Sequence, residues 1–171
     1  MFPSDIHDLA RRVIETYTTQ KRKIVTAESC TGGLVSAALT EIPGSSAVME
    51  RGFVTYSNDA KVEVLGVDPG MIDCFGAVSA EVAEAMATGA LEFSLADVAL
   101  SITGIAGPDG GTEKKPVGLV YLGLAKRGGG TFHYVCHFKG DRSNIRMQSV
   151  REALKLLMTA IEKNDRKSDY F

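Results

Sequence analysis

Apolar residues recur along this chain with two different periods, and these periods separate predicted helices from predicted strands. Between Ser4 and Thr18 they recur every three or four residues, which predicts an amphipathic helix with Ser4 as its N-cap. Short runs rich in β-branched and other apolar residues are typical of strands buried in a sheet. Such runs occupy 23–27, 49–55, 97–103, 119–125 and 131–138.

Helical segments are predicted between most of these strands. They cover 32–39, 58–65, a segment with Ser79 as N-cap, and a last helix from Asp141 or Arg142 to about Ile161. The strands 119–125 and 131–138 flank a glycine-rich turn, which predicts a hairpin. This order predicts an α/β fold, a single three-layer α/β/α domain over residues 1–171 with a mixed sheet covered by helices on both faces. We expect 164–171 to form a frayed tail.

One long segment, GIAGPDGGTEKKPVG (104–118), is too rich in glycine and proline to form a helix or a strand. A loop of this length in a compact domain is usually functional or disordered. Its glycines, which include Gly104 and Gly107, would let the backbone approach a ligand closely or close over it. A mobile surface loop is the alternative interpretation.

Composition and charge narrow the class of protein. The chain has 171 residues, of which 44% are hydrophobic, and a formal net charge of -2. A folded chain of this size buries about 70% of the surface that its unfolded form exposes, which allows a sizeable core. The near-neutral charge argues against a nucleic-acid partner, because nucleic-acid binders present clustered Lys and Arg. No apolar run approaches the ~18 residues of a membrane span, so we expect no membrane partner.

The cysteines indicate the compartment. Cys30, Cys74 and Cys136 are odd in number and form no C-x-x-C pair, which fits a reducing environment better than a disulfide framework. The N-terminus has no apolar stretch behind a basic region, as a secretory signal would. We therefore expect a cytoplasmic protein.

The string AESCTGG (27–33) offers the first candidate chemistry. A strand here runs into a glycine-containing turn that opens a helix, and the free backbone N–H groups of such a turn can stabilise an oxyanion or bind a phosphate. Ser29 is the hydroxyl best placed to use them, but a serine nucleophile needs a base within hydrogen-bond reach. The histidines do not look suitable, which leaves Lys61. Burial after an apolar strand can lower the pKa of this lysine enough for it to accept a proton.

Each of these residues also has a structural interpretation. Ser29 can be a helix cap, and Lys61 can be a solvated helix residue. Cys30 is the thiol alternative to Ser29 as nucleophile, although a free cysteine is commonly a small buried residue. Glu28 can orient Lys61, position water or cap the turn, and the sequence does not decide between these roles.

His133, Cys136 and His137 suggest a metal site at first sight. Successive side chains of a strand point to opposite faces, so Cys136 would face away from both histidines, and the three cannot converge without a bulge. We therefore expect these residues to be structural and the protein to hold no metal.

Four strings, in order, resemble the CinA C-terminal domain family: TAESCTGGLVSAAL, IPGSSAVMERGFVTYSNDAKVEVLGV, GAVSAEVAEAMATGAL and SITGIAGPDGGTEKKPVGLVYLGLA. The resemblance runs from about Val25 to Arg146. It implies hydrolysis of nicotinamide mononucleotide to nicotinic acid mononucleotide and ammonia, with a small nucleotide as partner and no cofactor. It also implies a Ser–Lys catalytic dyad, which falls on Ser29 and Lys61.

The resemblance implies roles for residues near the dyad. Tyr56 is expected to hydrogen-bond the dyad or to stack on the pyridinium ring. The developing oxyanion is expected to face backbone N–H groups. Their candidates are Cys30, Thr31, Gly32 and Gly33, aided by Thr103 and Gly104.

The phosphate of such a substrate needs a cationic or N–H-rich partner. Arg142 and Arg146 are four residues apart, so they share a face near the N-terminus of the last helix, where the helix dipole also favours anions. Ser45 and Ser46, which follow Pro43-Gly44, are further candidates through their hydroxyls. Solvent-exposed helix arginines are the alternative for Arg142 and Arg146.

The resemblance also bears on organisation. Many family members carry a further N-terminal domain with pyrophosphatase activity, and this chain begins immediately before the first predicted helix. We therefore expect the stand-alone form without that activity. Family members commonly associate, so the resemblance also implies a homo-oligomer. Two alternative functions stay open, namely a non-catalytic nucleotide-binding or competence-related regulatory module, and an amidase for a different small amide.

Overall fold

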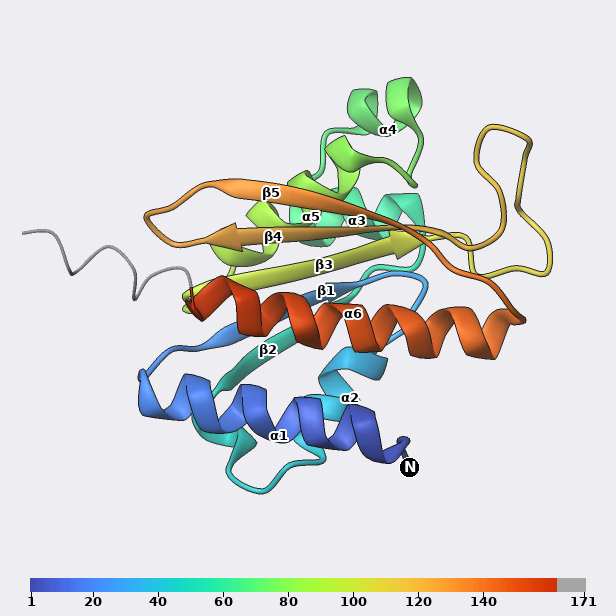
Figure 1. Ribbon diagram of the computed structural model, residues 1–171. Helices are drawn as coiled ribbons and strands as arrows, with labels where there is room; N and C mark the ends of the chain where they lie inside the picture. The colour runs from blue at the N-terminus through green and yellow to red at the C-terminus, as the bar shows by residue number, and fades with distance from the viewer. Residues whose placement is uncertain (163–171) are drawn as a thin grey trace, which may run out of the picture.

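A computed structural model describes residues 1–162 of the chain, in which five strands form one mixed sheet. The strands are β1 (Ile24–Glu28), β2 (Met49–Val54), β3 (Val98–Gly104), β4 (Leu119–Lys126) and β5 (Thr131–His137). Their order in the sheet is β2-β1-β3-β4-β5 (Figure 1). Strand β1 runs parallel to both β2 and β3, whereas the pairs β3–β4 and β4–β5 are antiparallel. The predicted mixed sheet and the predicted hairpin are thereby confirmed.

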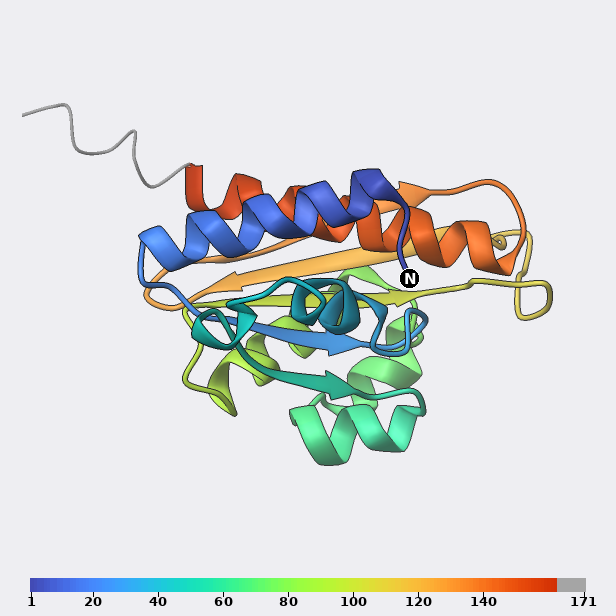
Figure 2. The same cartoon turned by 90° about the horizontal axis from the view of Figure 1, so that it is seen from below.

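Helices cover both faces of this sheet, as Figure 2 shows from below. They are α1 (Ser4–Thr19), α2 (Leu34–Thr40), α3 (Asn58–Leu65), α4 (Pro69–Phe75), α5 (Ala80–Glu92) and α6 (Arg142–Glu162), with a short 3-10 turn η1 (Ser45–Ala47) before β2. Helices α1, α2 and α6 pack together on one face, and α3, α4 and α5 cover the other. The three-layer α/β/α arrangement predicted from the sequence is confirmed.

Each face of the sheet has its own hydrophobic core, and β1 contributes to both. Ile24 packs with α1, α2 and α6, whereas Val25 and Ala27 pack with α5. Side chains alternate along a strand, so a strand covered on both faces requires apolar residues at successive positions. All five residues of β1 are buried between the two helical layers, including the polar Thr26 and Glu28.

Helix α5 lies unusually close to its neighbours because it is built from small residues. Ser79 caps it by accepting a hydrogen bond from the Val82 N–H, as expected. A Cβ on Gly123 of β4 would stand 2.2 Å from the Ala83 carbonyl oxygen, and a Cβ on Gly89 would stand 1.9 Å from the Leu65 carbonyl oxygen. Both approaches require glycine, so this layer is held at a distance that larger residues would not allow.

The structure differs from the sequence-based expectation at three helix starts. Ser4 is the first residue of α1 and makes no capping hydrogen bond, because Pro3 occupies the N-cap position. Helix α2 begins at Leu34 rather than at residue 32, since the two preceding glycines have positive φ angles. Helix α4 was not predicted. It is short, and its start, Asp68-Pro69-Gly70, has the composition of a turn.

The connections before and after β2 cross opposite faces of the sheet. The segment from β1 to β2 contains α2 and crosses one face, and the segment from β2 to β3 contains α3, α4 and α5 and crosses the other face. Strand β1 therefore lies at a topological switch point, and in α/β sheets ligands bind beyond the carboxyl ends of the strands at such a point. Every helix among residues 1–162 is too short or too polar to span a bilayer. The tail expected over 164–171 lies outside the described residues.

Candidate active site

Three strand ends converge at the carboxyl edge of the parallel part of the sheet. Ser29 follows β1, Thr55 and Tyr56 follow β2, and Thr103 and Gly104 end β3. The strands are in register there, because Glu28 pairs with both Val54 and Ile102. Segments that are far apart in the sequence are thus brought to one place.

Ser29 stands at the first position after β1, where the chain turns into α2. Its backbone N–H donates to the Ile102 carbonyl at 2.9 Å, which extends the sheet by one residue. The turn is completed by Gly32 and Gly33, with φ angles of 60° and 96°, a left-handed conformation that other residues adopt only under strain. The nucleophile candidate is therefore held rigidly at a strand-to-helix corner.

Glu28 caps helix α2, which is one of the roles that the sequence left open. Its carboxylate is fully buried and accepts hydrogen bonds from the backbone N–H groups of Gly33, Val35 and Ser36 at 2.8–3.1 Å, and from the Ser36 hydroxyl at 2.8 Å. These donors include N–H groups at the start of α2 that have no partner inside the helix. Glu28 makes no hydrogen bond to Lys61 in the structure.

Lys61 reaches Ser29 because of its position in the first turn of α3. Ser57 caps this helix by accepting from the Ala60 N–H at 3.0 Å. Helical side chains point back towards the N-terminus, so the Lys61 amine lies over the chain that enters the helix. Its Nζ is 3.1 Å from Ser29 Oγ, 2.9 Å from the Thr55 carbonyl oxygen and 3.4 Å from the Ser57 carbonyl oxygen. The two residues of the expected dyad are thus in contact.

The environment of Lys61 shifts its protonation equilibrium towards the neutral amine. The side chain is 1% exposed, and among the described residues its amine contacts a hydroxyl and two carbonyls but no carboxylate. Burial lowers the pKa of Lys61 below its ordinary value, because the loss of hydration outweighs the opposing electrostatic effect of Cys30. A neutral amine has two N–H bonds for the two carbonyls and one lone pair for the Ser29 hydroxyl. This is the arrangement that a general base requires.

Cys30 does not have the properties of a nucleophile. Its side chain is almost fully buried and packs in the core that α1, α2 and α6 share. Burial raises the pKa of the Cys30 thiol to about 12. Because the thiolate is the reactive form, the thiol of Cys30 stays protonated and unreactive near neutral pH.

A Cys30→Ser variant is therefore expected to keep most of the wild-type kcat, with at most a modest loss of thermal stability from the changed core contact. The measurement is ammonia release by the variant and the wild type, together with thermal unfolding of both. Complete inactivation of a folded Cys30→Ser variant would instead assign the nucleophile to the thiol.

The turn after Ser29 leaves two backbone donors free. The Gly32 N–H donates to the Ser29 carbonyl at 3.0 Å, and the Gly33 N–H donates to Glu28. Among the described residues, the N–H groups of Cys30 and Thr31 have no hydrogen-bond acceptor in another residue. Of the four predicted donors in this turn, these two therefore have no partner in the structure, and Cys30 also lines the pocket over Ser29.

A pocket of about 230 Å³ opens over the dyad. Its walls come from the turn after β1, the start of α3, the end of β3 and the loop between α4 and α5. It is lined by Ser29, Cys30, Tyr56, Asn58, Lys61, Ala77, Val78, Thr103, Gly104, Ala106 and Arg142. The Thr103 hydroxyl donates to the Ala77 carbonyl at 2.8 Å, which ties two of these walls together.

Tyr56 and Arg142 form one side of the pocket. Tyr56 is 62% exposed, and its hydroxyl accepts a hydrogen bond from Arg142 at 2.9 Å rather than contacting the dyad. Arg142 also donates to the Gly107 carbonyl at 2.8 Å, so it links the long loop to this side of the pocket. A stacking role for Tyr56 and a phosphate-binding role for Arg142 stay predictions.

The remaining phosphate candidates occupy different places. Arg146 donates to the carbonyl oxygens of Cys30 at 3.1 Å and Thr31 at 2.9 Å, behind the nucleophile turn. Ser45 and Ser46 lie in η1, which precedes β2 and therefore sits at the opposite edge of the sheet from Ser29. The structure does not bring these two serines to the pocket, since the start and the end of a parallel strand lie at opposite edges.

Sequence reasoning missed several residues that line the pocket. Ala77 and Val78 belong to the loop after α4, a helix that was not predicted. Asn58 is the first residue of α3, and its only sequence signal was its place after the N-cap serine. The Thr55 carbonyl, which contacts Lys61, is a backbone group, so the pattern of side chains in the sequence could not predict its role.

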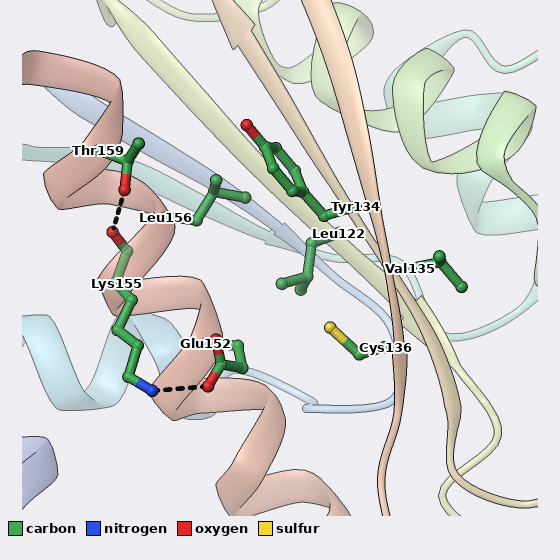
Figure 3. Close-up of a pocket in the computed structure, with 8 residues that line it drawn as sticks. All are labelled: Leu122, Tyr134, Val135, Cys136, Glu152, Lys155, Leu156 and Thr159. Atoms are coloured by element: carbon green, nitrogen blue, oxygen red, sulfur yellow. Dashed lines mark hydrogen bonds and ion pairs between the residues drawn. The ribbon is translucent and has the colours of Figure 1, made fainter. Parts of the chain in front are cut away.

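A second pocket lies between α6 and the strands β4 and β5, away from the dyad (Figure 3). Leu122, Tyr134 and Leu156 give it an apolar lining, and Lys155 pairs with Glu152 at 2.8 Å. Cys136 faces this side of the sheet, whereas His133 contacts Glu84 of α5 on the other side. Within residues 1–162 no three metal-ligand side chains cluster.

Comparison with known proteins identifies relatives over nearly the whole chain. The model of the CinA C-terminal domain matches residues 6–161. A putative competence-damage inducible protein of Caldicellulosiruptor saccharolyticus is 50% identical over 161 residues, which are 92% of this chain but only 38% of that relative. The nicotinamide-nucleotide amidohydrolase PncC of Escherichia coli K12 is 48% identical over 158 residues, which are 92% of this chain and 95% of the relative.

A solved structure agrees with the fold described above. The crystal structure of the competence/damage inducible protein CihA from Agrobacterium tumefaciens superposes with a TM-score of 0.91 at 51% identity, and the match covers 93% of this chain and 97% of that one. The sheet order, the two helical layers and the sequence match agree, and the chain belongs to the CinA C-terminal domain family.

Proposed function

We propose that this chain is an amidohydrolase that converts nicotinamide mononucleotide and water to nicotinic acid mononucleotide and ammonia, with Ser29 as nucleophile and Lys61 as general base. The observation that carries the proposal is the buried contact of 3.1 Å between Lys61 Nζ and Ser29 Oγ beneath an open pocket. A lysine without a carboxylate partner at this depth lowers stability, and a base for an adjacent serine is a function that such a lysine serves.

The first half of the reaction forms an acyl-enzyme. Neutral Lys61 takes the proton of the Ser29 hydroxyl while Oγ attacks the carboxamide carbon, and the carbonyl oxygen becomes an oxyanion. The N–H groups of Cys30 and Thr31 are the free donors beside Oγ for this charge. The Lys61 ammonium then gives its proton to the amide nitrogen, the C–N bond breaks, and ammonia leaves.

The second half regenerates the enzyme. Neutral Lys61 takes a proton from a water molecule, whose oxygen attacks the ester carbon of the acyl-enzyme. The C–O bond to Ser29 then breaks, and Lys61 returns the proton to Oγ. The product is the carboxylic acid, which ionises. One pair of residues thus serves both halves, as in other Ser–Lys hydrolases.

The substrate class is supported by relatives that this chain covers almost completely. Two of them carry the name nicotinamide-nucleotide amidohydrolase, at 48% and 44% identity. The Arg142 guanidinium in the pocket wall gives a negatively charged phosphate a partner at the pocket mouth. The exposed ring of Tyr56 offers a flat surface for a positively charged pyridinium ring.

The proposal is tested by ammonia release from purified protein with three substrates: nicotinamide mononucleotide, the riboside and the dinucleotide. We expect ammonia and the acid mononucleotide to form in equal amounts from the mononucleotide. Slower turnover of the riboside would fit a phosphate contact at Arg142. Binding of the mononucleotide without any ammonia would contradict the proposal and would favour a non-catalytic binding module.

We also propose that the protein acts in the cytoplasm and associates into a homo-oligomer. Cys30, Cys74 and Cys136 are all free thiols in the structure, which fits a reducing compartment. The mass of the protein in solution tests the association.

A further inference from the structure

We propose that Arg146 is a positioning residue that orients and polarises the two free N–H donors beside Ser29, rather than a ligand of the substrate phosphate. The inference rests on the proposed function, because it concerns the donors of the oxyanion in that reaction. It is based on two hydrogen bonds of Arg146 to main-chain carbonyls next to Ser29, neither of which involves the Ser29 hydroxyl or Lys61.

The first contact acts on the Thr31 N–H directly. Arg146 Nε donates to the Cys30 carbonyl oxygen at 3.1 Å. The peptide bond between Cys30 and Thr31 is planar and trans, so its C=O and N–H point in opposite directions. By holding the carbonyl towards α6, Arg146 fixes the direction in which the Thr31 N–H points.

The second contact acts on the Cys30 N–H through one more peptide group. Arg146 Nη2 donates to the Thr31 carbonyl at 2.9 Å, and the N–H of that same peptide group belongs to Gly32. The Gly32 N–H donates to the Ser29 carbonyl at 3.0 Å, and the opposite end of the Ser29 peptide group is the Cys30 N–H. Two hydrogen-bond chains therefore start at one guanidinium and end at the two free donors.

A charged donor at the head of such a chain strengthens its last member. Hydrogen bonds in series polarise one another, and a cation on a carbonyl makes the N–H of the same peptide group a better donor. Glu28 holds the other end of the turn through the N–H groups of Gly33, Val35 and Ser36. The turn is thus fixed by a cation on its carbonyls and an anion on its later N–H groups.

The position of Arg146 separates it from Arg142. Arg142 lines the pocket. Arg146 does not line it, and its N–H groups donate hydrogen bonds to main-chain carbonyls. The flat guanidinium suits this task, since its N–H groups diverge in a fixed fork that can serve two carbonyls at once. A lysine at this position would serve the two carbonyls less well.

The test compares Arg146→Gln and Arg146→Lys with the wild type in kcat, KM and thermal unfolding. For Arg146→Gln we expect kcat to fall by about 100-fold, as misplaced catalytic groups typically cause, with little change in KM. Arg146→Lys keeps the charge and one donor position, so it is expected to recover part of the lost kcat. It also keeps the test possible if Arg146→Gln does not fold.

Binding distinguishes positioning from phosphate contact. We expect the Kd of nicotinamide mononucleotide to be nearly the same for Ser29→Ala and for Ser29→Ala combined with Arg146→Gln, measured by calorimetry. A phosphate ligand would instead weaken binding by about 10-fold or more, as loss of a charged hydrogen bond does. That weakening, or an unchanged kcat in Arg146→Gln, would overturn the inference.

The matched control is Arg151→Gln, on the same helix. Arg151 pairs with Asp5 of α1, away from the pocket, so its loss is expected to leave kcat and KM unchanged. A wild-type protein that is inactive on the mononucleotide would contradict the proposed function, whereas an active wild type with a fully active Arg146→Gln variant would contradict only the role of Arg146.

Discussion

Ser29→Ala is expected to release no measurable ammonia from nicotinamide mononucleotide, a loss in kcat of about 10⁴-fold or more, as removal of a serine nucleophile causes in other hydrolases. The variant lacks the oxygen that forms the acyl-enzyme, and no neighbouring group replaces it, because the Cys30 thiol is buried and protonated. The fold should persist, since the only hydrogen bond of the Ser29 side chain among the described residues is the one from Lys61. Ammonia release and thermal unfolding measure the two effects.

Ser94→Ala is the matched control for this result. Ser94 is also buried, but it lies between α5 and β3, at the edge of the sheet opposite Ser29. Its hydroxyl bonds only to local main chain. We expect this variant to keep the wild-type kcat. Substantial turnover by a folded Ser29→Ala protein, or equal losses in both variants, would rule out Ser29 as nucleophile.

Lys61→Arg should be nearly as inactive as Ser29→Ala even though it keeps a long basic side chain. Arginine stays protonated at all accessible pH values, so it cannot accept the Ser29 proton. Lys61→Met, which removes the amine but keeps an unbranched chain, is expected to lose kcat to a similar degree. Both variants are measured with saturating substrate, and binding is checked by calorimetry.

The pH dependence of the wild type gives the same test without a mutation. The active form of Lys61 is the neutral amine, whose population rises with pH through the pKa of the group. Burial lowers this pKa from the ordinary value of 10.5, so kcat/KM should rise with pH with a midpoint below 10.5. A rate that does not change with pH between mildly acidic and mildly alkaline buffer would contradict Lys61 as the base.

The sequence pattern predicted the sheet well because its strands are simple in composition. The segment around β1 is short and rich in β-branched residues, and the hairpin of β4 and β5 has a glycine-rich turn between two regular runs. Short helices were harder. Residues 69–75 begin with proline and glycine, which weigh against a helix in any local pattern, although Asp68 and Pro69 are a good start for one.

The geometry of the site could not be predicted from the separation of its residues along the sequence. Ser29 and Lys61 are 32 positions apart, a separation that fixes no distance until β1 pairs with β2 and Ser57 starts the next helix. The expectation for Ser45 and Ser46 rested on a neighbouring turn, and the direction of β2 places them at the far edge. Glu28 was undecided because capping and catalysis require the same residue type.

The buried amine of Lys61 also has a consequence for how this chain can change over evolutionary time. Because its pKa is lower in the folded chain than in the unfolded one, Lys61 destabilises the fold most below the folded pKa, and this cost disappears as the pH rises towards 10.5. An apolar side chain at this position would avoid that cost. Selection for thermal stability alone would therefore favour replacing Lys61 with an apolar residue. Selection for catalytic activity would favour keeping the lysine.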